Sequence, residues 1–229
     1  MHNVALYASG ANPGHIESAL LSSADYIVLC LEDGTPEDKK HEARFLVKHA
    51  LANEAFRRDK RRIVVRINGV ETTHIDDDLR AILSGDNPPN AIRVPMLKNR
   101  EQFELVLSYL AEYNYFEKGR IELMVENVQM LDYLDDILSQ HGHLLSCITI
   151  GGEDLANSLI TGSSLDYVKK TVIALANRYS LPTLETTFMD YTNLQGLKEN
   201  TEKAKELGFW GRSVVHPTHV AICTEIFKD

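Results

Sequence analysis

Charged residues directly follow several apolar runs of this sequence, although such side chains are costly to bury unless they are paired or bound to something. Acidic residues follow three of the runs: Glu32, Asp33, Glu126, Glu153 and Asp154. A fourth run ends in Arg66, which Asn68 follows, and His216 ends a fifth. A single residue of this kind often only caps a helix, and Asp33 and Asp154 each fit that interpretation. Several of them together indicate a common site.

Carboxylates and a guanidinium in one place predict a particular kind of site. Carboxylate oxygens suit Mg²⁺, which takes one or two protein carboxylates, keeps water ligands and accepts oxygens from a substrate. Arg66 suits a substrate carboxylate, because its guanidinium donates two parallel hydrogen bonds. A metal ion that chelates an oxo- or hydroxy-acid stabilises an enolate as charge develops on oxygen. Aldol-type cleavage of a carbon–carbon bond needs this stabilisation.

Short apolar runs alternate with longer amphipathic stretches along the chain, and this alternation predicts parallel strands joined by helices. The eight runs are Val4–Tyr7, Tyr26–Leu31, Ile63–Ile67, Ala91–Val94, Ile121–Val125, Cys147–Ile150, Thr183–Phe188 and Ser213–Val215. The clearest helical patterns are Glu37–Phe56, Arg100–Tyr113, Val128–Gln140, Leu165–Tyr179 and Leu194–Leu207. Eight such units in 229 residues predict an α/β protein, a single (β/α)8 TIM barrel that forms one domain over residues 1–229.

A closed barrel also places the site, because the carboxyl ends of its strands meet at one face. The main rival is a doubly wound open sheet, which often binds a dinucleotide. The glycine-rich segment Ser9–Gly14 lacks the dinucleotide fingerprint, and this favours the barrel.

Composition narrows the partners of the protein. The formal net charge is −9 and the basic run Arg57–Arg62 is interpreted as a solvated helix end, so no nucleic-acid partner is expected. The sequence has three cysteines, Cys30, Cys147 and Cys223. Their odd number and wide spacing argue against a disulfide framework or a zinc site. The sequence shows no signal peptide and no apolar run of about eighteen residues, so we expect a cytoplasmic enzyme without a membrane partner.

The same segments resemble a known family, the citrate lyase β-subunit-like proteins of the HpcH/HpaI aldolase type, which include malyl-CoA lyases. The resemblance runs from about Leu6 to Phe227. It rests on the order of short motifs: Leu6–Pro13, Leu29–Gly34 followed by Lys39 and Ala43–Arg44, Val65–Gly69, Val125–Glu126, Gly151–Leu155, Leu207–Ser213 and His216–Pro217. Each motif is weak alone, and their order and spacing together are specific.

The resemblance implies a Mg²⁺ ion on Glu126 and Asp154 and a substrate carboxylate on Arg66. We assign catalytic roles to Arg66, Glu32 and Asp33. We assign substrate contacts to Arg66, Asn68, Gly152 and Glu153. The resemblance also implies an acyl-CoA thioester or a related oxo- or hydroxy-acid as substrate, and a homo-oligomer, usually a trimer or hexamer.

The sequence departs from the family pattern at several positions. Cys30 replaces an aspartate, Met96 stands where many members have lysine, and Glu185 stands where an aspartate is usual. In full-length lyases a C-terminal segment covers a neighbouring subunit's site, and this sequence stops soon after Pro217. On that basis we expect an open pocket that is slow with CoA thioesters.

Three hypotheses about function follow. The first is a lyase or aldolase that acts on a small oxo- or hydroxy-acid or its CoA thioester. The second is a non-catalytic or regulatory subunit that keeps the barrel and the metal–acid pocket for binding. The third is a phosphoryl-transfer enzyme that uses phosphoenolpyruvate on a similar barrel.

Overall fold

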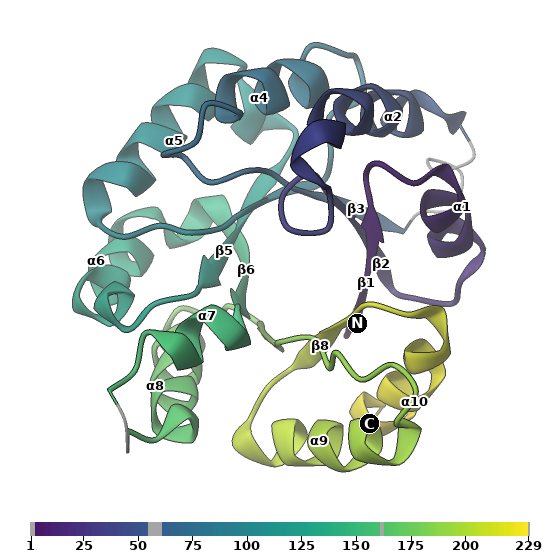
Figure 1. Cartoon of the computed structure of the whole chain (residues 1–229). Helices are drawn as coiled ribbons and strands as arrows, with labels where there is room; N and C mark the ends of the chain where they lie inside the picture. The colour runs from purple at the N-terminus through teal and green to yellow at the C-terminus, as the bar shows by residue number, and fades with distance from the viewer. Residues whose placement is uncertain (1–2, 55–60, 161–162, 229) are drawn as a thin grey trace.

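Eight parallel strands close into a barrel in the computed structural model, which describes residues 3–54, 61–160 and 163–228. Each strand pairs with the next, and β8 pairs back with β1 (Figure 1). The strands are β1 Val4–Ser9, β2 Tyr26–Cys30, β3 Arg62–Arg66, β4 Ala91–Val94, β5 Arg120–Val125, β6 Leu145–Ile150, β7 Thr183–Glu185 and β8 Gly211–Val214. The predicted (β/α)8 barrel is confirmed.

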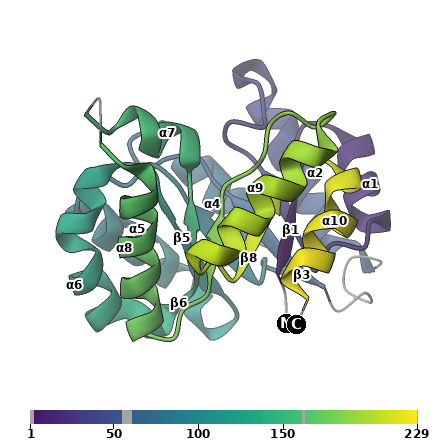
Figure 2. The same ribbon diagram turned by 90° about the horizontal axis from the view of Figure 1, so that it is seen from below.

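Helices surround the barrel and connect successive strands, as Figures 1 and 2 show from two directions. They are α1 Pro13–Leu21, α2 Lys40–Ala52, α4 Ile75–Leu83, α5 Arg100–Glu112, α6 Leu131–His141, α7 Gly152–Asn157, α8 Leu165–Arg178, α9 Leu194–Leu207 and α10 Pro217–Phe227. Short 3-10 turns are η1 Glu37–Lys39, η2 Tyr115–Glu117, η3 Val128–Met130 and η4 Gly142–Leu144. Gly208 ends α9 in the left-handed conformation with φ of 104°, which glycine adopts without steric cost.

The alternation of side chains along each strand separates two cores. In β1, Val4, Leu6 and Ala8 pack in the large apolar cluster with residues of the helices, whereas Ala5 and Tyr7 belong to a second, smaller cluster. Successive strand residues point to opposite faces of the sheet. The smaller cluster is therefore the interior of the barrel, and its upper members form the base of the site.

The barrel interior contains an ion pair that is closed off from water. Arg93 and Glu122 are both 0% exposed, and Arg93 donates from Nε and Nη2 to Glu122 Oε2 at 2.9 and 2.7 Å. The Nη1 atom of Arg93 donates to the Tyr7 hydroxyl at 2.7 Å and to Ser213 Oγ at 3.2 Å. Arg62 Nη2 lies 3.4 Å from the other Glu122 oxygen. The pair and its partners thus link five strands, β1, β3, β4, β5 and β8, and fix the orientation of the Tyr7 ring.

The structure corrects the predicted end of the seventh strand. β7 ends at Glu185 instead of Phe188. The carbonyl of the next residue, Thr186, accepts hydrogen bonds of 3.1 and 3.0 Å from the Arg212 guanidinium, so it is not available for pairing between strands. Glu185 is buried against α8, where Lys169 Nζ lies 2.8 Å from its carboxylate. Glu185 therefore lies on the outer face of the barrel and not in the site.

Several smaller expectations can be compared with the structure. The predicted helix Glu37–Phe56 begins with a 3-10 turn and continues as α2 to Ala52, and residues 55–60, which include most of the basic run, lie outside the described part. The three cysteines are free and buried. Within the described residues, no helix has both the length and the apolar character needed to cross a membrane.

Candidate active site

A cavity of about 480 Å³ opens at the carboxyl ends of the strands. Most of the site residues predicted from the sequence line it: Asp33, Arg66, Glu126, Gly152, Glu153 and Asp154. Glu32 and Asn68 line an adjoining groove of about 710 Å³, which also contacts Asp33. The structure thus brings these eight residues to one face of the barrel, two of them in the groove beside the cavity, whereas His216 lines neither space.

Arg66 is the centre of the charged cluster. Its side chain is 9% exposed, and its Nη2 atom lies 3.1 Å from Asp33 Oδ2 and 3.2 Å from Glu126 Oε1. The same nitrogen forms an ion pair with Glu32. The Arg66 Nε atom is buried and has no hydrogen-bond partner among the described residues. Three carboxylates therefore lie around the Nη2 atom of Arg66, while its Nε atom has no partner among the described residues.

Glu126 is held in place by backbone atoms from two neighbouring loops. The Met96 N–H donates to Glu126 Oε2 at 2.5 Å, and Met96 has a φ of 57°, in a region that is uncommon for residues other than glycine. On the other side, a Cβ atom at Gly151 would lie 2.3 Å from Glu126 Cγ. Only glycine at position 151 leaves room for the carboxylate. Backbone strain of this kind is often found at functional sites.

The pKa values of the acids reflect this crowding. Burial raises the pKa of Glu126, and the nearby carboxylates of Asp154 and Asp33 raise it further, against the lowering effect of Arg66 and the Met96 N–H. Burial also raises the pKa of Glu32 to about 7, again against Arg66. Both carboxyls therefore hold a proton more readily than a carboxyl in water does, mainly because they are buried and in addition because other carboxylates lie nearby.

The donor set fits a hard divalent cation. No group of three or more His, Cys, Asp or Glu side chains is arranged to hold a metal ion within residues 3–54, 61–160 and 163–228. Mg²⁺ needs fewer, since one or two carboxylates with waters and substrate oxygens suffice. Glu126 and Asp154 line the same cavity and interact electrostatically. The residues that line the mouth thus supply the carboxylate oxygens and the excess negative charge that such an ion prefers.

Substitution of Glu32 gives a pH-dependent prediction. Between about pH 4.5, its ordinary pKa, and about 7, the folded protein holds a proton that the unfolded chain has released. Stability therefore falls as the pH rises through this window. In Glu32→Gln this contribution is absent, so we expect a flatter pH profile and higher stability than the parent at pH 8. Urea denaturation from pH 5 to 8 in the presence of a chelator measures both.

Glu104→Gln, at an exposed position on α5, is the matched control and should keep the slope of the parent. A Glu32→Gln profile that parallels that of the parent would show that another group titrates in this range.

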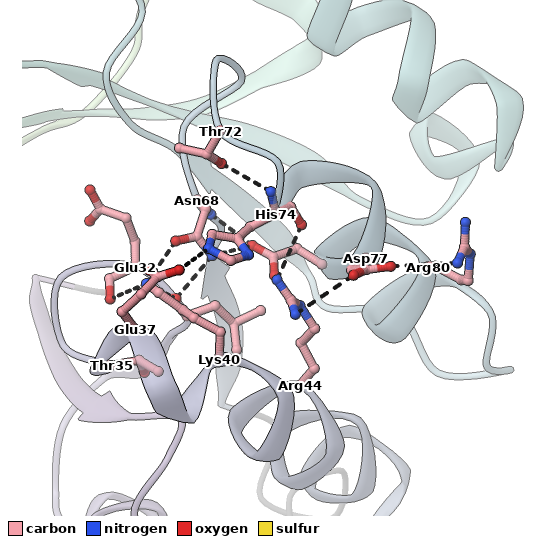
Figure 3. Close-up of polar contacts among 12 residues, drawn as sticks. Glu32, Thr35, Glu37, Lys40, Arg44, Asn68, Thr72, His74, Asp77 and Arg80 are labelled. Carbon is pink, nitrogen blue, oxygen red and sulfur yellow. Dashed lines mark hydrogen bonds and ion pairs between the residues drawn. The ribbon is translucent and has the colours of Figure 1, made fainter.

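A buried polar network positions the loop that carries Glu32 (Figure 3). Lys40 Nζ donates to the carbonyl oxygens of Leu31 and Glu32 at 2.8 and 2.9 Å and to Asn68 Oδ1 at 2.8 Å. Asn68 Nδ2 donates to Leu31 O at 3.0 Å and to Asp78 Oδ2 at 2.6 Å. Arg44 Nε donates to Asp78 Oδ1 at 2.7 Å. The network joins the β2–α2 loop to the β3–α4 loop.

This network changes the interpretation of two residues. Asn68 was predicted to contact substrate, but both of its amide hydrogens are already donated inside the protein, so it positions the Glu32 loop instead. The family-like lysine was placed at Lys39, which is exposed and pairs with Glu42. Lys40 is the buried one. Its spacing from Ala43 and Val47 on the inner face of α2 was the signal that could have identified it.

The other two substrate-contact candidates lie in α7. Gly152 N–H donates to Thr186 Oγ1 at 3.1 Å, so this backbone donor is already used. Glu153 is exposed and lines the cavity.

Sequence reasoning missed the residues at the base of the cavity. Tyr7, Met124, Thr149 and Ser213 line it from inside the barrel. They belong to the strands and look like ordinary core positions in the sequence. Side chains along a strand point alternately into the barrel and out of it. Only counting back in steps of two from the polar residue at each strand end could have indicated that these residues point inward.

Comparison with known proteins agrees with this fold. Residues 3–217 match the family model described as HpcH/HpaI aldolase/citrate lyase. The chain is 25% identical to the mitochondrial citramalyl-CoA lyase of Rattus norvegicus, over 97% of this chain and 70% of the relative. It is 23% identical to the citrate lyase subunit beta of Leuconostoc mesenteroides subsp. cremoris, over 97% of this chain and 75% of that protein.

Solved structures show the same fold. RipC from Yersinia pestis superposes with a TM-score of 0.81 at 19% identity, covering 100% of this chain and 96% of that one. The citrate lyase beta subunit from M. tuberculosis, complexed with oxaloacetate and magnesium, gives a TM-score of 0.77 at 20% identity, with 99% and 97% covered. With a family model that spans nearly its whole length, the chain belongs to the HpcH/HpaI aldolase/citrate lyase family.

Proposed function

We propose that this protein is a magnesium-dependent carbon–carbon lyase that acts on a small oxo- or hydroxy-acid or its CoA thioester. The observation that carries the proposal is the meeting of Arg66 with the acids Glu32, Asp33 and Glu126 at one barrel mouth, where Asp154 also lines the cavity. Membership of the family supports it, as does a fold shared with a protein whose structure holds oxaloacetate and magnesium.

Each side chain has a chemical task in this proposal. Glu126 and Asp154 hold the metal, which when bound acts as a Lewis acid on the substrate oxygens. Arg66 binds the substrate carboxylate, and Asp33 keeps the guanidinium oriented. Glu32 accepts the hydroxyl proton, and the carbon that carried the hydroxyl becomes a carbonyl as the carbon–carbon bond breaks. The electron pair of that bond forms an enolate, to which Glu32 returns the proton. With a pKa of about 7, Glu32 can both take and return a proton at neutral pH.

The experiment that tests the proposal is a lyase assay on the purified protein with Mg²⁺. Citramalyl-CoA, citryl-CoA, malyl-CoA and the corresponding free acids are offered separately, and the released oxo-acid is measured. We expect release from at least one substrate, with loss of activity on chelation and recovery on return of Mg²⁺. Tight binding of an acid with Mg²⁺ and no product would favour the non-catalytic binding role instead.

Arg66→Lys gives a second prediction about the same site. Lysine keeps the positive charge but cannot form the two-pronged hydrogen bond. We expect affinity for a hydroxy-acid in the presence of Mg²⁺ to fall at least about tenfold, since a hydrogen bond to a charged group contributes about 1.5–3 kcal/mol. Titration calorimetry measures this change. Affinity equal to that of the parent would remove Arg66 from substrate binding.

A further inference from the structure

The base of the cavity has hydrogen-bonding groups that the proposed reaction does not use. Thr149 on β6 is 1% exposed, lines the cavity, and its Oγ1 atom has no hydrogen-bond partner in the described part of the chain. A buried hydroxyl without a partner is destabilising and rare, so its presence needs an explanation. Arg66 lines the same cavity, and its Nε atom has no partner within the described residues, so it is available to a carboxylate that binds there.

Tyr7 adds a third available donor. Its hydroxyl oxygen accepts a hydrogen bond from Arg93 at 2.7 Å, which leaves the hydroxyl proton free to be donated. Burial raises the pKa of Tyr7, although Arg93 and Arg66 lower it, so the hydroxyl keeps its proton at neutral pH. The ion pair between Arg93 and Glu122 fixes the direction of this donor.

The three groups have the same polarity. Arg66 Nε can only donate, and the Tyr7 and Thr149 hydroxyls both have a proton to give. The positive charges of Arg93 and Arg66 also act on the Tyr7 hydroxyl and lower its pKa, against the larger effect of burial. The acids of the site belong to the mouth of the cavity. The groups at the base therefore suit an anionic acceptor with more than one oxygen. In a site proposed to bind a small acid, that acceptor is a carboxylate.

We propose that Thr149, Tyr7 and Arg66 Nε form a buried carboxylate subsite, which selects dicarboxylic hydroxy- or oxo-acids over acids with an alkyl end. The inference deepens the proposed function and rests on it. Thr149 pairs with Met124 in the sheet, and Glu126 lies two residues further along β5. Two residues of strand span roughly 6.6 Å. A compact four-carbon acid therefore has the length to place one end near the metal carboxylates and its other carboxylate on the base.

Malate and 2-hydroxybutyrate provide the test, because they differ only in a terminal carboxylate against a methyl group. Binding of each is measured by calorimetry with Mg²⁺. We expect the parent protein to bind malate at least about tenfold more tightly. Thr149→Val should lower malate affinity about tenfold, as for loss of a hydrogen bond to a charged group, and leave 2-hydroxybutyrate within about twofold. Thr149→Ser keeps the hydroxyl and should keep the malate affinity.

Thr224→Val is the matched control, since Thr224 on α10 also carries a buried hydroxyl without a partner among the described residues and does not line the cavity. It should leave both affinities unchanged. Thermal unfolding checks that Thr149→Val folds, and no loss of stability is expected because no hydrogen bond within the protein is removed.

The possible failures are distinct. Equal malate affinity in Thr149→Val and the parent would overturn the subsite, and the Thr149 hydroxyl would then serve only an internal water or remain unsatisfied. Mg²⁺-dependent binding of both acids with equal affinity by the parent would overturn the subsite and leave the proposed function standing. If the parent bound neither acid in the presence of Mg²⁺, both the subsite and the proposed use of free acids would be wrong.

Discussion

Glu126→Gln is expected to lower kcat/KM of the lyase reaction, and the affinity for Mg²⁺, by at least about 100-fold. The amide has the shape of the carboxylate and can still accept from the Met96 N–H, but it has lost the negative charge through which a carboxylate attracts Mg²⁺. Loss of a residue that only supports a ligand typically costs 10–100-fold, so loss of a ligand itself should cost at least the upper figure. Calorimetry with Mg²⁺ and steady-state kinetics give the two values.

The size of the Glu126→Gln effect separates a metal ligand from a structural acid. Asp154→Asn should have an effect of the same kind, whereas Glu104→Gln on the outer surface should change neither quantity. If Glu126→Gln kept Mg²⁺ affinity within about threefold of the parent, Glu126 would only serve as a partner for Arg66, and the metal would have to be placed elsewhere.

Arg93→Met should lower the free energy of unfolding by about 3–5 kcal/mol, the range for breaking a buried ion pair by removing one partner. Glu122 would then stay 0% exposed, with Arg62 at 3.4 Å as its remaining cation among the described residues. Tyr7 and Ser213 would each lose a donor in the same step. Urea denaturation at pH 7 measures the change.

Two further variants identify the origin of this loss. Arg93→Met combined with Glu122→Leu removes both charges and should recover at least about half of the lost stability, since apolar replacement of a whole pair is often neutral. Arg80→Met removes an arginine that is 70% exposed and pairs with Asp77 on the surface, and should cost at most about 1 kcal/mol. A similarly small loss in Arg93→Met would mean that water or relaxation solvates Glu122.

The fold could be predicted from the sequence because a barrel repeats one simple signal. Each strand reads as a short apolar run, and each helix as a longer amphipathic one. Several predicted strand ends differ from the structure by one or two residues. The largest difference is at β7, where the Arg212 side chain from another strand binds the Thr186 carbonyl just after the strand. An interaction of that kind leaves no local trace in the sequence.

The candidate site divides along a similar line. Acids at strand ends are visible in the sequence because a charge after an apolar run is conspicuous. Whether such a residue faces the cavity or instead binds other side chains of the protein depends on partners elsewhere in the chain. Asn68 and Glu185 are examples, because both bind other side chains. The base residues Tyr7 and Thr149 are hidden for the opposite reason, because they are spaced like ordinary strand residues.

The network that joins Lys40, Asn68, Asp78 and Arg44 has a consequence for the way this protein opens. Proteins fluctuate in cooperative units, and groups that share buried hydrogen bonds open together. Exposure of Asn68 would remove one acceptor from the ammonium of Lys40 and a donor from the fully buried carboxylate of Asp78 at once. The second and third strand–helix units should therefore open as one piece. Glu32 then cannot leave its position while Arg66 keeps its own. If the protein is the lyase proposed above, a partly opened molecule should therefore be inactive.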